Sequence, residues 1–60
     1  MRPNVPIHAV FLRIGDVILE DDREPFPVRE VEHIDGAVAV YGPELCVRVY
    51  WQDQEVVVQR

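Results

Sequence analysis

The chain has 60 residues, a mass of 7.0 kDa and a formal net charge of −5, with eleven acidic residues against six basic ones. A chain of this length forms one small domain without a deep cofactor cleft, and it buries only about 60% of the surface that its unfolded form exposes. All six basic residues are arginine. The acidic balance disfavours nucleic acid, because contacts with phosphates require cations that displace condensed counterions.

The cysteine content and the hydropathy pattern indicate a cytoplasmic protein. Cys46 is the only cysteine, so it cannot form an intramolecular disulfide. Its apolar neighbours Leu45 and Val47 predict that it is a small buried hydrophobic residue. No apolar run reaches the length of a signal sequence or of a bilayer span, so we expect no membrane partner.

The residue pattern predicts an all-β fold. Twelve valines favour strands, and no segment keeps the spacing of an amphipathic helix over ten residues. Residues 1–7 contain two prolines and are expected to form an extended N-terminal arm, followed by a single small domain over residues 8–60. Strands are predicted over residues 8–14, 28–34, 37–41, 45–51 and 55–59, with a short apolar piece at 17–19.

Two local signals set the expected connections. Asp35-Gly36 predicts a two-residue type I′ hairpin, because both positions of that turn need a positive φ. A bulge near Arg29 and Glu30 would place Val28 and Val31 on the same face of their strand.

We expect these strands to curl into a small five-stranded antiparallel barrel, which would bury one face and pair most edges. Leu45, Ile14 and Ile34 are expected to close its ends. The predicted inward residues are Val10, Leu12, Val17, Ile18, Val28, Val31, Val38, Val40, Val47, Val49, Val56 and Val58.

Residues 10–58 resemble the small Src-homology-3-like barrels of the Tudor and KOW type. The similarity rests on a strand that ends in Ile14-Gly15-Asp16-Val17, a long loop, and a further strand that enters the Asp35-Gly36 hairpin. The resemblance implies a binding module for peptides, modified side chains or nucleic acid. This chain differs from the KOW readers of nucleic acid because it is acidic and has no lysine, and no functional residue is carried over.

The sequence offers little material for catalysis, and we expect no catalytic residue, metal site or cofactor. It contains neither serine nor threonine, which removes hydroxyl nucleophiles. His8 and His33 are expected to be partly exposed strand residues, and a pairing of Cys46 with His33 is the only remaining nucleophile arrangement. The acidic loop is interpreted as a solvated segment, with contact to a basic partner or a hard cation as alternatives. It contains Glu20, Asp21, Asp22 and Glu24.

Aromatic and arginine side chains that fall opposite the predicted core form the candidate partner-binding surface, a composition typical of interfaces. The alternative is that these rings only cover the barrel ends. Val57 points outward on the terminal strand, which suggests a neighbouring strand or a second subunit there. The candidate residues are Phe11, Arg13, Phe26, Tyr41, Arg48, Tyr50 and Val57.

The sequence therefore predicts a non-catalytic interaction module, a small bacterial or bacteriophage accessory or regulatory protein that binds a protein partner or itself. One alternative is a nucleic-acid-binding oligomer in which Phe11 and Tyr50 stack on bases. A variant of it is an acidic decoy that imitates nucleic acid, and the other alternative is a structural subunit of a larger assembly. The nucleic-acid alternative requires four arginines on one face, namely Arg2, Arg13, Arg48 and Arg60.

Overall fold

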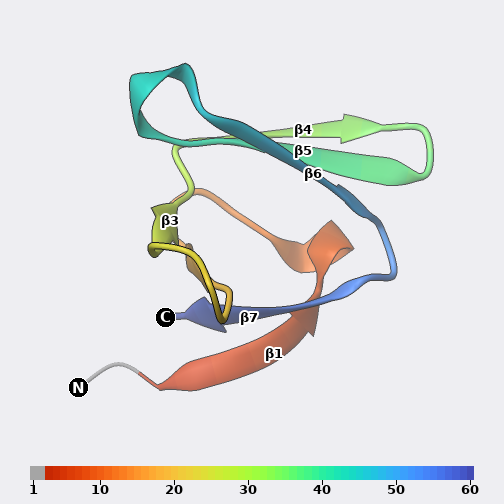
Figure 1. The fold of residues 1–60 in the computed structure, drawn as a ribbon. Coiled ribbons are helices and arrows are strands. Elements are labelled where there is room, and N and C mark those ends of the chain that lie inside the picture. Colours follow the sequence, from red (N-terminus) through yellow and green to blue (C-terminus); the bar gives the residue numbers. More distant parts are fainter. Residues whose placement is uncertain (1–2) are drawn as a thin grey trace.

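The computed structural model describes residues 3–60, and it contains seven short strands in two antiparallel sheets (Figure 1). No helix in this range is long and apolar enough to cross a bilayer. The strands are β1 (Asn4–His8), β2 (Val17–Leu19), β3 (Phe26–Pro27), β4 (Glu30–Ile34), β5 (Ala37–Tyr41), β6 (Val47–Trp51) and β7 (Glu55–Gln59), with 3-10 turns η1 (Ala9–Phe11) and η2 (Pro43–Leu45).

The two sheets lie one over the other and do not close into a barrel. One has the strand order β1-β7-β2-β3 and the other the order β4-β5-β6 (Figure 1). A short turn at residues 52–54 carries the chain from β6 in one sheet to β7 in the other. The all-β prediction is confirmed, whereas the five-stranded closed barrel is wrong.

The predicted strand 28–34 is divided between the two sheets, which explains why it does not run as one barrel strand. The Val28 N–H donates to the carbonyl oxygen of Asp16 at 2.8 Å, next to β2, and the Arg29 N–H donates to that of Tyr41 at 2.8 Å, in β5. Tyr41 also lies opposite Glu30 in the ladder. Two residues thus oppose one, which confirms the predicted bulge.

The N-terminal segment belongs to a sheet, and the expected unpaired arm over residues 1–7 is wrong for the part that is described. β1 pairs with β7 over its whole length, while residues 1–2 lie outside the described range. Pro6 is compatible with this pairing. The Ala9 N–H donates to the Gln54 carbonyl oxygen and the Arg60 N–H donates to that of Pro3, so the backbone N–H and C=O groups of the odd-numbered residues of β1 point toward β7. The missing N–H of Pro6 therefore falls on the open edge of β1.

The first predicted strand is also displaced. His8 is the last residue of β1, and the next three residues form η1, with the Leu12 N–H donating to the Ala9 carbonyl oxygen at 3.0 Å. Val10 is consequently exposed instead of lying in the core. Ala9 takes that place and is fully buried.

The hairpin at Asp35-Gly36 is confirmed, with Ile34 opposite Ala37. Its turn type is not the expected one, because Gly36 has a φ of 76° while Asp35 does not have a positive φ. The positive φ that the turn needs is thus confined to the glycine, which adopts it without a steric penalty from a Cβ atom.

The core lies between the sheets and is built from ten buried side chains. Leu12, Ile18, Val28, Val38, Val40, Val56 and Val58 are confirmed as inward residues. Val47 and Val49 are exposed, so the predicted orientation of β6 is wrong, and Ile14, Ile34 and Leu45 are exposed and close no barrel end. The remaining core members are Ala9, Phe26 and Tyr50, with Val31 packed against them and Val17 half-buried.

A first prediction concerns the tight approach of Gly42 to the ring of Phe26. A Cβ atom on Gly42 would lie 2.7 Å from Cζ of Phe26, although the backbone of Gly42 is extended. Gly42→Ala is therefore expected to lower the free energy of unfolding by about 1–3 kcal/mol, the usual range for an overpacked core. Urea unfolding measures this change.

The double variant with Phe26→Leu is the control, because the smaller side chain makes room for the added methyl group. We expect it to lose less stability than the sum of the two single variants. A Gly42→Ala variant as stable as the parent chain would show that the ring does not sit against Gly42.

Candidate functional site

The outer face of the β4-β5-β6 sheet carries a stripe of exposed apolar side chains. Along β6, Val47, Val49 and Trp51 expose 52%, 62% and 68% of their surface. The register places Tyr41, Ala39 and Ala37 opposite them in β5. Beyond β5, the same face of β4 carries Glu30, Glu32 and Ile34.

The opposite face of β6 is directed inward and holds its polar residues. Tyr50 is buried in the core, and its hydroxyl donates to Glu20 at 3.4 Å. Nη1 of Arg48 donates to a Glu20 carboxylate oxygen at 2.6 Å, and its guanidinium lies 4.4 Å from the ring centre of Phe26. These contacts satisfy the polar groups of both long side chains beneath the sheet. The valines of β6 are therefore turned to solvent.

The loop before β6 extends the apolar stripe. Glu44 and Leu45 in η2 both have positive φ angles, 59° and 61°, which non-glycine residues rarely adopt. Leu45 is 98% exposed. Two consecutive residues in this region cost of the order of 1–3 kcal/mol each, so the loop holds Leu45 outward against a local conformational penalty. We call Leu45, Val47, Val49 and Trp51 the β6 stripe.

The seven predicted partner-binding residues are not gathered on one surface. Phe26 and Tyr50 are buried and are core residues, which corrects their assignment to the outside. Arg48 is half-buried on the inward face. Tyr41 lies on the outer sheet face and donates its hydroxyl to Glu32 at 2.8 Å, and this bond raises its pKa above the usual value.

A neighbouring strand or a second subunit was expected beside Val57, and the structure places neighbouring strands there. β7 lies between β1 and β2, with Val57 opposite Pro6 and Leu19. Neither edge of β7 is open, so a second subunit cannot add a strand to it.

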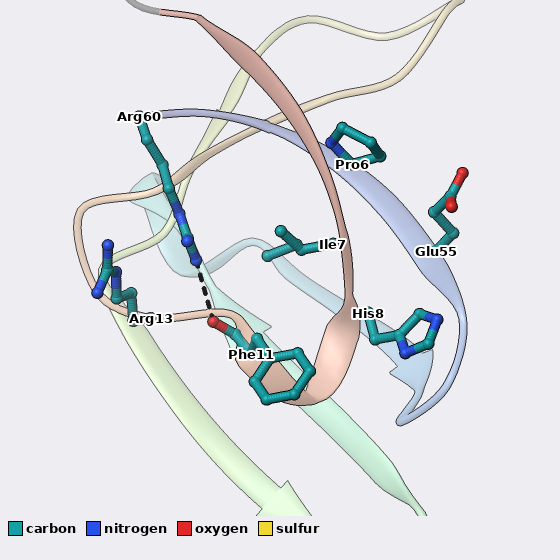
Figure 2. A pocket seen from close by; sticks show the side chains of 7 residues that line it. All are labelled: Pro6, Ile7, His8, Phe11, Arg13, Glu55 and Arg60. Carbon is teal, nitrogen blue, oxygen red and sulfur yellow. Dashed lines mark hydrogen bonds between the residues drawn. The ribbon is translucent and has the colours of Figure 1, made fainter.

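Phe11 and Arg13 line a separate groove of about 530 Å³ beside β1. In the view of Figure 2, Arg60 and Arg13 lie on one side of it, and His8 and Glu55 lie on the other. Arg60 reaches from the end of the chain to the carbonyl oxygen of Phe11, at 3.1 Å (Figure 2).

Arg60 is committed to a structural ion pair. Its guanidinium contacts both carboxylate oxygens of the buried Asp16, at 2.9 and 3.1 Å, and these hydrogen bonds raise its pKa. Asp16 also accepts the N–H of Arg13 at 3.1 Å. The pair joins the end of the chain to the turn before β2, so Arg60 does not offer a free guanidinium to an anion.

The arginine convergence required for nucleic-acid binding is not formed by the described residues. Arg13 and Arg60 line the groove beside β1, whereas Arg48 is ion-paired with Glu20 beneath β6. Arg2 lies outside the described range. The described residues therefore do not favour this alternative.

The acidic loop is only partly the solvated segment that was predicted. Glu20 is half-buried and contacts both Arg48 and Arg23, the latter at 3.5 Å. Asp21, Asp22 and Glu24 are exposed. Within residues 3–60, no group of three His, Cys, Asp or Glu side chains is placed to hold a metal ion.

The thiol and the imidazoles are all at the surface. Cys46 is exposed, which corrects its assignment as a buried residue, because it lies in the turn that precedes β6 and not inside a strand. His8 and His33 are exposed residues of two different strands, as predicted.

The β6 stripe was missed because Val47 and Val49 were assigned to the interior and Leu45 to a barrel end. The length of the loop contains a signal that could have found it. When an odd number of residues separates two paired antiparallel strands, residues that lie opposite each other are both even-numbered or both odd-numbered, so the even-numbered residues of both strands share one face. The five residues between Tyr41 and Val47 thus put Arg48 and Tyr50 on the side of Val38 and Val40.

Comparisons of the chain with protein-family models, curated proteins and solved structures give no match.

A second prediction concerns stability at high pH. Burial raises the pKa of Tyr50 above its usual value of 10.0, so the folded state holds this proton more tightly than the unfolded state. Stability is then fully present below about pH 10 and falls as the pH rises toward the folded pKa. The chain has no lysine, whose ordinary pKa of about 10.4 would otherwise add its own change of stability in this pH range.

Urea unfolding at a series of pH values measures this effect. Tyr50→Phe is expected to lose less stability between neutral and alkaline pH than the parent chain. Tyr41→Phe is the comparison: the pKa of Tyr41 is also raised, by its hydrogen bond with Glu32 at the surface, where solvent screens the effect, so we expect a smaller change in the same direction. Equal alkaline losses in the parent and Tyr50→Phe would place Tyr50 outside the core.

Proposed function

We propose that this protein is a non-catalytic interaction module that binds another protein through the outer face of β6. The observation that carries this proposal is the β6 stripe, four large apolar residues at alternate positions that are all exposed. A chain of 60 residues has few apolar side chains to spare from its core. A row of exposed apolar side chains on such a small surface is typical of a binding site.

Two further features support a recognition surface. The strained backbone at Glu44 and Leu45 keeps a fully exposed leucine beside the strand, and backbone strain of this kind is concentrated at functional sites. Trp51 lies at the other end of the stripe, and tryptophan is among the residues that contribute most to binding at protein interfaces.

The resemblance to Src-homology-3-like modules of the Tudor and KOW type is part of the same proposal. Two small antiparallel sheets packed over one core are compatible with such a module. Modules of this type are usually binding domains, which agrees with a surface that offers apolar side chains and backbone groups. A small accessory protein that acts through one partner is the function that fits these features.

A third prediction tests whether the β6 stripe is the interface. Val49→Arg places a charge in its middle, while Val57→Arg places the same charge on the other sheet and serves as the matched control. We expect the parent chain and Val57→Arg to be cross-linked to the same protein in an extract of the source cells. Val49→Arg is expected to lose that product.

Thermal unfolding of each variant shows that the fold is intact before the comparison. An identical cross-linked product from Val49→Arg would contradict the proposal. So would a parent chain that forms no cross-linked product and stays monomeric at all concentrations.

A further inference from the structure

The ladder between β5 and β6 defines which backbone groups of β6 are free. The Gln52 N–H donates to the Gly36 carbonyl oxygen at 3.1 Å, and the Gly42 N–H donates to that of Cys46 at 2.8 Å. Hydrogen-bonded pairs alternate along an antiparallel ladder, so the even-numbered residues of β6 are bonded to β5. The odd-numbered residues direct their N–H and C=O groups away from β5. β6 is the last strand of its sheet, so these groups lie on an open edge.

Part of this edge is already closed by the chain itself. The Trp51 N–H donates to Oε1 of Gln54 at 3.3 Å, and the Gln54 N–H donates to the Trp51 carbonyl oxygen at 3.0 Å. The open section is therefore Val47 and Val49, with two donors and two acceptors. An extended segment laid beside β6 would satisfy all four groups and continue the apolar face.

A second copy of the chain fits this edge poorly. A pairing that uses the open groups of both copies places Val47 opposite Val49 and brings Arg48 opposite Arg48 of the second copy. Such a ladder joins only three residues of each copy, and two chains that each carry a net charge of −5 repel each other. Shifting the register to overlap all of β6 places Trp51, whose backbone is already bonded to Gln54, opposite Val47. A different protein is thus the better occupant.

The charges around the edge indicate the chemistry of that occupant. None of the side chains on the outer face of the β4-β5-β6 sheet is basic, and Glu30 and Glu32 lie on it. Glu24 and Glu44 line a groove of about 290 Å³ at the start of β6, together with Arg48. Within residues 3–60, these four glutamates form no ion pair, whereas Arg48 is neutralised by Glu20. Glu30 and Glu32 lie on β4, on the other side of β5, whereas Glu24 and Glu44 lie at the start of β6, so the unpaired charges nearest the edge are negative.

The walls of that groove suit a long cationic side chain. Pro25, Pro27 and Pro43 line it, so its carboxylates are set against apolar surface. Arginine and lysine place their methylene groups on apolar surface and their charged ends against carboxylates.

We propose that β6 binds, as an added strand, an extended segment of another protein in which apolar residues alternate with arginine or lysine. This inference rests on the proposed function and specifies the partner. The apolar side chains of the segment lie beside Val47 and Val49 on the outer face. Its basic side chains lie near Glu24 and Glu44, and its backbone bonds to the four open groups of the edge.

A fourth prediction tests the partner with defined peptides and the full chain. The probe is the capped heptapeptide Arg-Val-Arg-Val-Arg-Val-Arg, and its binding is measured by calorimetry at low and moderate salt. Two peptides are controls: one with glutamate in place of each arginine, and one with the same residues in the block order Arg-Arg-Arg-Arg-Val-Val-Val. We expect only the alternating basic peptide to bind, with an affinity that falls as salt increases.

Variants locate the bound strand. Val49→Pro removes a donor on the open edge without removing a ladder bond to β5, so the fold is expected to persist while affinity falls about tenfold. Glu24→Gln with Glu44→Gln is expected to weaken binding, whereas Glu55→Gln, beside the other groove, is not. Amide hydrogen exchange at Val47 and Val49 is expected to slow when the peptide is bound.

The outcomes separate this inference from the proposed function. Equal binding of the alternating and block peptides, or unchanged binding by Val49→Pro, would overturn strand addition. Absence of peptide binding would overturn the inference. If, in that case, the chain still forms a cross-linked product that Val49→Arg abolishes, the interaction module stands with a partner of another chemistry.

Discussion

The position of Glu20 beneath β6 determines which side of that strand faces solvent. Its carboxylate accepts a hydrogen bond from Arg48 at 2.6 Å and from the hydroxyl of the buried Tyr50 at 3.4 Å. With these partners the two long side chains fill the space under the sheet with their apolar parts, while their polar ends are satisfied. Strand geometry then forces their odd-numbered neighbours to the opposite face. The exposed β6 stripe is the direct consequence of a polar network that is placed inward.

This arrangement leaves on the surface apolar side chains that could otherwise be buried in the core. Val47 and Val49 would add apolar burial if β6 were rotated, but Arg48 would then lose Glu20 and its contact with the ring of Phe26. The chain instead builds its core from smaller contributions of both sheets, and the Asp16–Arg60 ion pair ties the end of the chain to the turn before β2. A small domain that leaves apolar residues and a strand edge open gains most from a partner that covers both.

Some of the structure was predictable from local chemistry. The hairpin at Asp35-Gly36, the final strand and the bulge at Arg29 followed from turn residues and β-propensity. The division into two sheets was not, because it depends on the bond from the Val28 N–H to Asp16, which is a contact between distant residues. Alternation in β6 correctly separated its two faces. It did not reveal which face is inward, because the face opposite the valines holds a tyrosine and an arginine whose polar groups are bonded to a carboxylate that is distant in the sequence.

The environment of Trp51 tests the orientation of β6 most directly, since it is the only tryptophan in the chain. Its side chain is 68% exposed on the outer face. At concentrations where the chain is monomeric, its fluorescence is expected to resemble that of the urea-unfolded chain in emission wavelength and in quenching by acrylamide. A blue-shifted emission with strong protection from acrylamide would show that the odd-numbered residues of β6 are buried, and would contradict an outward-facing β6 stripe.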